Sequence, residues 1–150
     1  EQLKNAMGKD LDPPLQFYIN HNDNSHPERK GLKDFFRNWA TVEDQRVDYT
    51  NFLLNLARHK FVLSPRGNAI DCHRNWEVLY MRRVPVMKRH PYLEKLFENY
   101  PVLFVDKYSD VTKDLLIAND HLFQQALEMN LSDLTLPKFF DNIVHRYVNT

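Results

Sequence analysis

The sequence is poor in cysteine and in glycine. Its 150 residues include one cysteine, Cys72, and three glycines. A single cysteine excludes an internal disulfide framework and a cysteine-rich zinc site. Glycine is the residue that best lets a backbone approach a ligand closely, so in a chain with so few glycines the place of each one is informative.

The sequence also has no excess of charge and no long apolar run. Twenty Lys and Arg residues balance twenty Asp and Glu residues. This balance disfavours a general attraction to nucleic acid or anionic membranes, and we expect no nucleic-acid partner, although a local basic cleft stays open. The apolar runs fall far short of the roughly 20 residues that cross a bilayer. With 43% apolar residues, the chain is expected to form one globular domain over residues 1–150.

Short apolar segments alternate with amphipathic ones along the chain. Strands are predicted at residues 15–19, 40–43, 60–64, 84–87 and 101–105. Helices are predicted at residues 26–38, 49–59, 70–83, 92–99, 111–129 and 136–147, the last within a C-terminal region at 134–150. Residues 1–14 form a polar lead-in segment. Alternation of strands and helices about every 25–30 residues is typical of βαβ units, and it predicts an α/β fold with a doubly wound, mostly parallel sheet and helices on both faces.

Two loops follow predicted strands at the sheet edge where ligands bind in such folds. The first, residues 20–25, is a run of turn-forming residues. Asn20 or His21 would be able to reach a ligand from it, but an ordinary turn is the preferred interpretation. The second loop, residues 64–71, leads into the predicted helix at 70–83.

The second loop and the helix after it carry an unusual set of residues. Gly67 permits close approach of the backbone, and the free N–H groups at the start of a helix attract an anion such as phosphate. Helical spacing places His73, Arg74 and Glu77 on one arc, and Cys72, Trp76 and Leu79 on the opposite arc. A guanidinium in the first turn can grip a diphosphate, and a carboxylate one turn later can accept hydrogen bonds from both hydroxyls of a ribose. Arg74 and Glu77 are therefore candidates to bind a nucleoside diphosphate.

Motifs in and around this loop resemble one enzyme family. Residues 61–68 read Phe-Val-Leu-Ser-Pro-Arg-Gly-Asn, residues 71–77 contain Asp-Cys-His-Arg and Trp-Glu, and residues 84–86 read Val-Pro-Val. Together they resemble the nucleotide-sugar-binding domain of exostosin-like glycosyltransferases, with looser similarity from Tyr18 to about Thr112. The resemblance implies a Rossmann-like domain that forms the carboxyl-terminal half of a GT-B-type enzyme. It also implies a reaction without metal or cofactor, in which protein groups neutralise the leaving diphosphate.

The resemblance also implies roles for individual residues. Arg74 would contact the diphosphate and Glu77 the ribose. The same pocket would be lined by Arg66, Gly67, Asn68, Asp71 and His73. Lys88, which follows the predicted strand at 84–87, is a further candidate contact to the diphosphate. The chain departs from the family pattern at Ala69, where a second glycine is expected.

Each candidate also has a structural reading. Arg74 and Glu77 have the spacing of a surface ion pair on a helix. His73 would equally satisfy a neighbouring carbonyl, and Asp71 in the first turn would favourably oppose the helix dipole. Lys88 would equally fit a solvent-exposed basic turn. No His-Glu-x-x-His motif and no dense acidic cluster points to a metal site.

The sequence therefore predicts the donor domain of a glycosyltransferase. Its partners would be a nucleotide-diphosphate sugar, a glycan or protein acceptor, and an N-terminal acceptor domain on a missing segment or on another chain. The alternative is a degenerate domain that binds a nucleotide or a partner without transfer. A different nucleotide-dependent Rossmann-like enzyme is a third reading, against which stands the lack of a Gly-x-Gly-x-x-Gly motif. The sequence does not show whether the protein is anchored in the Golgi membrane, cytosolic or viral. It also does not identify the sugar and base of the donor or the stereochemical outcome of the transfer.

Overall fold

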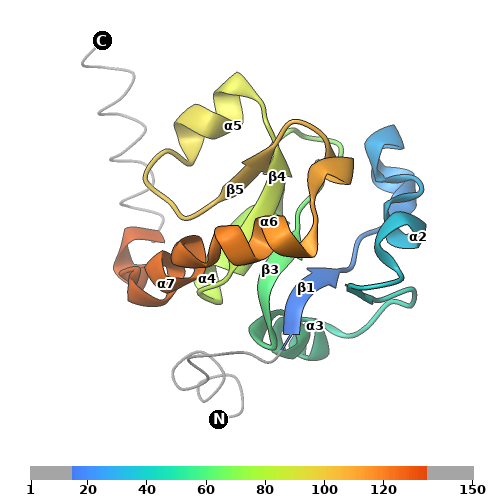
Figure 1. The fold of residues 1–150 in the computed structure, drawn as a ribbon, viewed down its shortest axis with the longest axis horizontal. Helices are drawn as coiled ribbons and strands as arrows, with labels where there is room; N and C mark the ends of the chain where they lie inside the picture. Colours follow the sequence, from blue (N-terminus) through green and yellow to red (C-terminus); the bar gives the residue numbers. More distant parts are fainter. Residues whose placement is uncertain (1–14, 135–150) are drawn as a thin grey trace.

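The computed structural model of the protein describes residues 15–134 (Figure 1). The predicted lead-in segment at 1–14 and the predicted helix at 136–147 lie outside the described residues.

Five parallel strands form a single sheet in the order β2-β1-β3-β4-β5. The strands are β1 (Leu15–Ile19), β2 (Thr41–Val42), β3 (His59–Leu63), β4 (Val84–Lys88) and β5 (Leu103–Val105). Every pairing between neighbouring strands is parallel, and β1 and β3 are aligned with Tyr18 opposite Val62. The predicted α/β fold is confirmed, and in the described part of the chain the sheet is parallel throughout.

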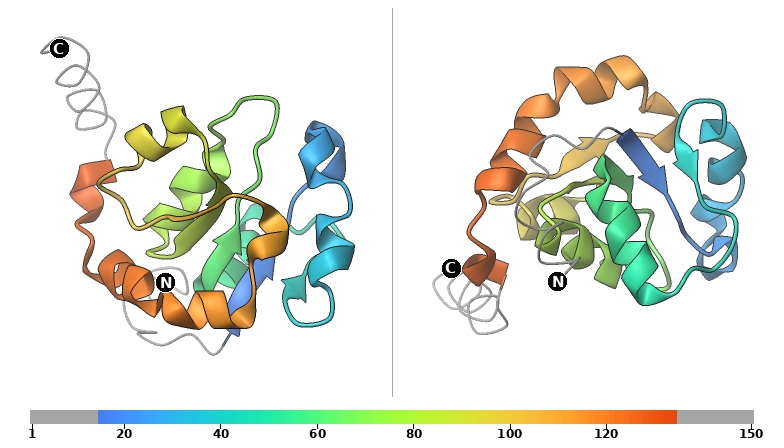
Figure 2. Two further views of the ribbon diagram at one scale, coloured as in Figure 1. Left: turned by 45° about the horizontal axis from the view of Figure 1, so that its top comes forward. Right: turned by 90° about the horizontal axis from the view of Figure 1, so that it is seen from below.

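Helices cover both faces of this sheet, as predicted (Figure 2). They are α2 (Leu32–Phe36), α3 (Tyr49–Ala57), α4 (His73–Tyr80), α5 (Pro91–Leu96), α6 (Lys113–Ala118) and α7 (Asp120–Glu128). Side chains of α2, α6 and α7 share one core cluster with the sheet. Side chains of α3, α4 and α5 form two clusters on the opposite face.

The side chains of β1 show how the sheet divides the core. Phe17 and Ile19 point to the side of α6 and α7, whereas Tyr18 between them points to the side of α3. All three are at most 2% exposed. Strands that are buried on both faces read as continuous apolar runs, and this is why β1 and β3 stand out in the sequence.

The predicted helix at 26–38 is confirmed only at residues 32–36, because the chain forms separate short elements there. A 3₁₀ turn at Pro27–Arg29 is followed by α2, and Gly31 lies between them with a φ of 79°. This left-handed conformation cannot belong to a right-handed helix, and glycine adopts it at little cost.

The predicted helix at 111–129 is also two helices, α6 and α7, which meet at Asn119. The side chain of Asn119 donates to the carbonyl of Leu115 at 2.8 Å. Thr112 caps α6 by accepting the N–H of Leu115.

The predicted helix at 70–83 begins later and ends earlier than expected, since α4 spans His73–Tyr80. Asp71 holds the residues before it in a loop by accepting hydrogen bonds from two side chains of the first turn. Arg82 has a φ of 56°, which ends any continuation of the helix.

Candidate functional site

The sheet order creates a crevice at the carboxyl ends of β1 and β3. The chain leaves β1 toward β2 on one side, whereas β3 leads to β4 and β5 on the other side. In parallel α/β sheets, ligands bind where the strand order reverses in this way. The two loops singled out in the sequence, residues 20–25 and 64–71, therefore follow the strands on either side of the crevice.

Arg29 ties these two loops together. Its guanidinium donates to three backbone carbonyls: from Nη1 to Asn22 at 3.1 Å, from Nη2 to Pro65 at 3.0 Å and from Nε to Arg66 at 2.8 Å. The residue is 8% exposed. Because the donors of Arg29 are distributed between both loops, their relative position is fixed by one side chain.

Gly67 makes room for this arginine. A Cβ atom added at Gly67 would lie 3.3 Å from Nη2 of Arg29, tighter than an ordinary van der Waals contact. The absence of a side chain at position 67 thus has a structural reason inside the protein. Contact between Gly67 and a ligand stays a prediction.

Arg74 lies in the first turn of α4 and is largely enclosed. Its guanidinium carbon is 5.1 Å from the ring centroid of Phe52, which is a cation–π distance. The Nε and Nη1 atoms are shielded from solvent and have no hydrogen-bond partner among the described residues. Burial lowers the pKa of Arg74 from its usual value, and an arginine in a protein nevertheless keeps its charge. The result is a partly buried cation with two shielded nitrogen atoms that lack a partner in the described part of the protein.

Arg74 lines two neighbouring cavities. One, of about 700 Å³, lies against the loop after β1 and the loop after β2. The other, of about 290 Å³, lies against the start of α3. Asn20 and Arg46 also line both cavities, so Arg74 stands where they meet with a second arginine beside it.

Glu77 lines the smaller of these cavities together with Arg74. The structure thus brings together the two residues predicted to bind diphosphate and ribose. Tyr49, which is 61% exposed, stands at the same cavity. Burial, the charge of Glu77 and a hydrogen bond with Glu77 raise the pKa of Tyr49. A carboxylate and an aromatic hydroxyl therefore adjoin the buried guanidinium.

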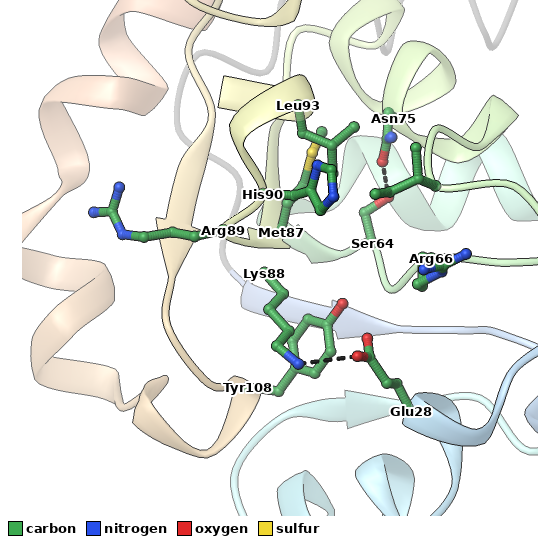
Figure 3. A pocket seen from close by; sticks show the side chains of 11 residues that line it. Glu28, Ser64, Arg66, Asn75, Met87, Lys88, Arg89, His90, Leu93 and Tyr108 are labelled. Carbon is green, nitrogen blue, oxygen red and sulfur yellow. Dashed lines mark hydrogen bonds and ion pairs between the residues drawn. The ribbon is translucent and has the colours of Figure 1, made fainter. Parts of the chain in front are cut away.

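Arg66 and Lys88 lie at a different cavity, of about 160 Å³ (Figure 3). Lys88 pairs there with Glu28, whose Oε1 atom is 2.9 Å from Nζ. The Nε atom of Arg66 is buried without a hydrogen-bond partner in the described part of the protein. Lys88 does not line either of the Arg74 cavities, so the structure separates the two predicted diphosphate contacts.

Asp71 has both carboxylate oxygens engaged inside the protein. Oδ1 accepts from the side chain of Asn75 at 2.8 Å, and Oδ2 accepts from the indole of Trp76 at 3.0 Å. These contacts fix the junction between the loop and α4. His73 and Asn68 are exposed and do not line the three cavities described above.

Sequence reasoning missed six residues that the argument uses at this edge: Glu28, Arg29, Arg46, Tyr49, Asn75 and Tyr108. Glu28 and Arg29 fall in the part of the predicted helix at 26–38 that precedes α2, where charged residues are ordinary surface residues. The partners of Arg29 at Pro65 and Arg66 are 36 and 37 residues away, and no local pattern signals them. The spacing of Asp71 and Asn75 by four residues was the one available signal, because such residues are neighbours on a helix.

No protein-family model matches this chain, and a search of the curated proteins found no significant match. The structure supports a Rossmann-like parallel α/β domain, and the family stays a prediction that rests on the motifs. Between residues 15 and 134, no group of three or more His, Cys, Asp or Glu side chains is arranged to hold a metal ion. In the same range no helix has the length and apolar character to span a bilayer.

Proposed function

We propose that this chain is the donor-binding domain of a glycosyltransferase, and that it binds a nucleotide-diphosphate sugar at the carboxyl edge of its sheet. The observation that carries the proposal is the partly buried guanidinium of Arg74, which has two shielded nitrogen atoms without a partner among the described residues and lies at the meeting point of two cavities. A buried charge is costly unless an ion of opposite sign and hydrogen bonds compensate it. A diphosphate supplies both.

The neighbours of Arg74 favour a nucleotide over a simple anion. Arg46 and Asn20 share its cavities and add a positive charge and an amide. Glu77 and Tyr49 lie at the smaller cavity, where a carboxylate can accept from the hydroxyls of a ribose and an aromatic ring can stack on a base. Charge for the diphosphate and acceptors for the ribose thus occur side by side.

The transfer step itself is supported by the resemblance to exostosin-like enzymes. Negative charge develops on the diphosphate as its bond to the sugar breaks. Arg74 would stabilise this charge from a fixed, enclosed position, where such interactions are stronger than in water. Arg66, with its buried unpaired Nε atom, would be a second donor. An inverting enzyme of this architecture would take its general base from the acceptor half.

A domain that binds a nucleotide without transferring sugar is the second candidate. It is favoured by Lys88, which is paired with Glu28 at a separate cavity instead of standing beside Arg74. One predicted stabiliser of the leaving group is therefore engaged elsewhere. Release of UDP from a bound UDP-sugar, slowed by Arg74→Ala, would argue for transferase chemistry. Tight binding with no release in the presence of sugar acceptors would favour the second candidate.

Calorimetric titration of the chain with UDP, GDP and their sugar conjugates, with and without EDTA, tests the binding proposal. We expect saturable binding that EDTA does not change and that Arg74→Ala weakens at least about tenfold, because a charged hydrogen-bonded pair is worth about 1.5–3 kcal/mol. Arg58→Ala is the matched control, since Arg58 is exposed at the end of α3 and lines none of these cavities. Equal affinity of the wild type and Arg74→Ala would refute the site.

A further inference from the structure

The cavity that holds Lys88 and Glu28 has a chemistry of its own. It lies at the ends of β3 and β4, and the view into it shows polar groups around an apolar wall (Figure 3). The Lys88–Glu28 pair and the hydroxyl of Tyr108 occupy one side. Ser64 and Asn75, hydrogen-bonded to each other, occupy another.

The size and lining of this cavity fit a single polyhydroxylated ring. Its volume of about 160 Å³ is below the roughly 300–1,000 Å³ of sites for drug-sized ligands, so it has room for a small group. Met87 and Leu93 supply apolar surface. The carboxylate of Glu28 can accept hydroxyl donors, and the ammonium of Lys88 can donate to hydroxyl oxygens. A sugar ring presents apolar C–H faces and hydroxyls together.

This cavity adjoins the proposed nucleotide site. Arg74 lines the cavities on the α3 side, and the next residue, Asn75, lines the cavity of Lys88. The two sites thus lie on either side of the first turn of α4. A diphosphate bound at this turn would have the nucleoside on one side and the sugar on the other.

The charges around the cavity are mostly compensated. Lys88 is neutralised by Glu28. Arg89 forms ion pairs with two carboxylates. Its Nη1 atom is 2.5 Å from Oε1 of Glu94, and its Nε atom is 3.3 Å from Oδ1 of Asp106. Arg66 and His90 also line the cavity. We have assigned the unpaired Nε atom of Arg66 to the diphosphate, and the Nδ1 atom of His90 accepts the N–H of Tyr92. Glu28 is the carboxylate of the lining.

We propose that Glu28 is a specificity-determining residue, which makes this cavity select a neutral sugar ring over a carboxylated one such as a uronic acid. The proposal rests on the proposed donor-binding function and names the substrate class of its sugar. The Glu28 carboxylate accepts hydroxyl groups of a neutral sugar, repels a second carboxylate, and compensates the lysine that would otherwise attract it.

The test compares UDP-glucose with UDP-glucuronate, or GDP-mannose with GDP-mannuronate if the chain prefers GDP. The wild type should bind the neutral sugar nucleotide at least about tenfold more tightly, since like charges in contact cost more than 1.4 kcal/mol. In Glu28→Gln the ratio of the two dissociation constants should fall to about one or reverse, because Lys88 is released. Asp114→Asn, which removes an exposed carboxylate of α6 outside the lining, should keep the wild-type ratio.

Lys88→Met gives a second test of the ratio of the two dissociation constants, and this test does not depend on the stability of Glu28→Gln. It leaves the Glu28 charge uncompensated and should increase the preference for the neutral sugar. A ratio that neither variant changes would overturn the role of Glu28, while binding of UDP or GDP alone would still uphold the proposed function. Failure of the folded wild type to bind any of these nucleotides would overturn both.

Discussion

Arg29 is buried and Arg74 is partly buried at the same edge of the sheet, and their surroundings are opposite. Arg29 donates to three backbone carbonyls, whereas Arg74 leaves two nitrogen atoms unpaired. A guanidinium in which every nitrogen atom donates to the chain holds structure, and we propose that the one with unpaired nitrogen atoms serves a ligand. Arg74 was predictable because it starts a helix after a glycine-containing loop. Arg29 was not, because its partners are distant carbonyls that leave no mark on the sequence.

Arg29 and Gly67 should be energetically coupled. Arg29→Ala should lower the free energy of unfolding by about 2–4 kcal/mol, since it leaves three carbonyls of the crevice without their charged donor. Gly67→Ala should be destabilising in the wild type, where the new methyl group crowds Nη2 of Arg29, and close to neutral in the Arg29→Ala background. Urea denaturation of the four proteins measures this coupling. Strict additivity would show that Gly67 does not make room for the arginine.

His21 should make stability depend on pH. Burial lowers the pKa of this histidine from 6.5 to about 4, and the residue is 3% exposed. The folded protein therefore binds a proton less readily than the unfolded chain. The stabilisation is complete above about pH 6.5 and is lost as the pH falls toward 4, by on the order of 3 kcal/mol. The stability difference between the wild type and His21→Gln should be constant above pH 7 and shrink below it. An unchanging difference down to pH 4.5 would contradict this.

At the level of helices and strands, the apolar segments were easier to predict than their interruptions. The core runs of β1, β3 and β4 are evident in the sequence because both faces are buried. The breaks between short helices depend on single polar contacts, such as the hydrogen bond from Asn119 to the carbonyl of Leu115. The spacing of apolar residues does not reveal such contacts, and it therefore predicted one helix where α6 and α7 are separate. The late start of α4 at His73 has the same kind of cause, namely the hydrogen bonds that Asp71 accepts from the side chains of Asn75 and Trp76.

Asp71 should act through the geometry of α4. Asp71→Ala removes the acceptor of both Asn75 and Trp76, and should cost about 1–3 kcal/mol of unfolding free energy. The emission of Trp76 should also shift, because its indole N–H loses its partner. Urea denaturation and tryptophan fluorescence measure the two effects. Asp114→Ala, at an exposed carboxylate in the first turn of α6, serves as the control. Unchanged stability and fluorescence in Asp71→Ala would show that these two hydrogen bonds are not formed in solution.

For the whole molecule, the alternation of strands and helices was enough to predict a parallel α/β sheet. The strand order was not, because it depends on which distant strands pair. That order places the crevice between β1 and β3, and it puts Arg74 and Lys88 at separate cavities on either side of α4. The sequence predicts one pocket for all eight candidate residues. The fold instead places Arg74 and Glu77 at one cavity and Arg66 and Lys88 at another, and it leaves the other four outside the three cavities.

A crystal structure of the chain with UDP or GDP bound, at a nucleotide concentration well above the dissociation constant, would test this arrangement most directly. We predict that oxygen atoms of the diphosphate lie within hydrogen-bond distance of Nε and Nη1 of Arg74, with the ribose hydroxyls at Glu77. A nucleotide bound elsewhere, with these two atoms still unpaired, would contradict it.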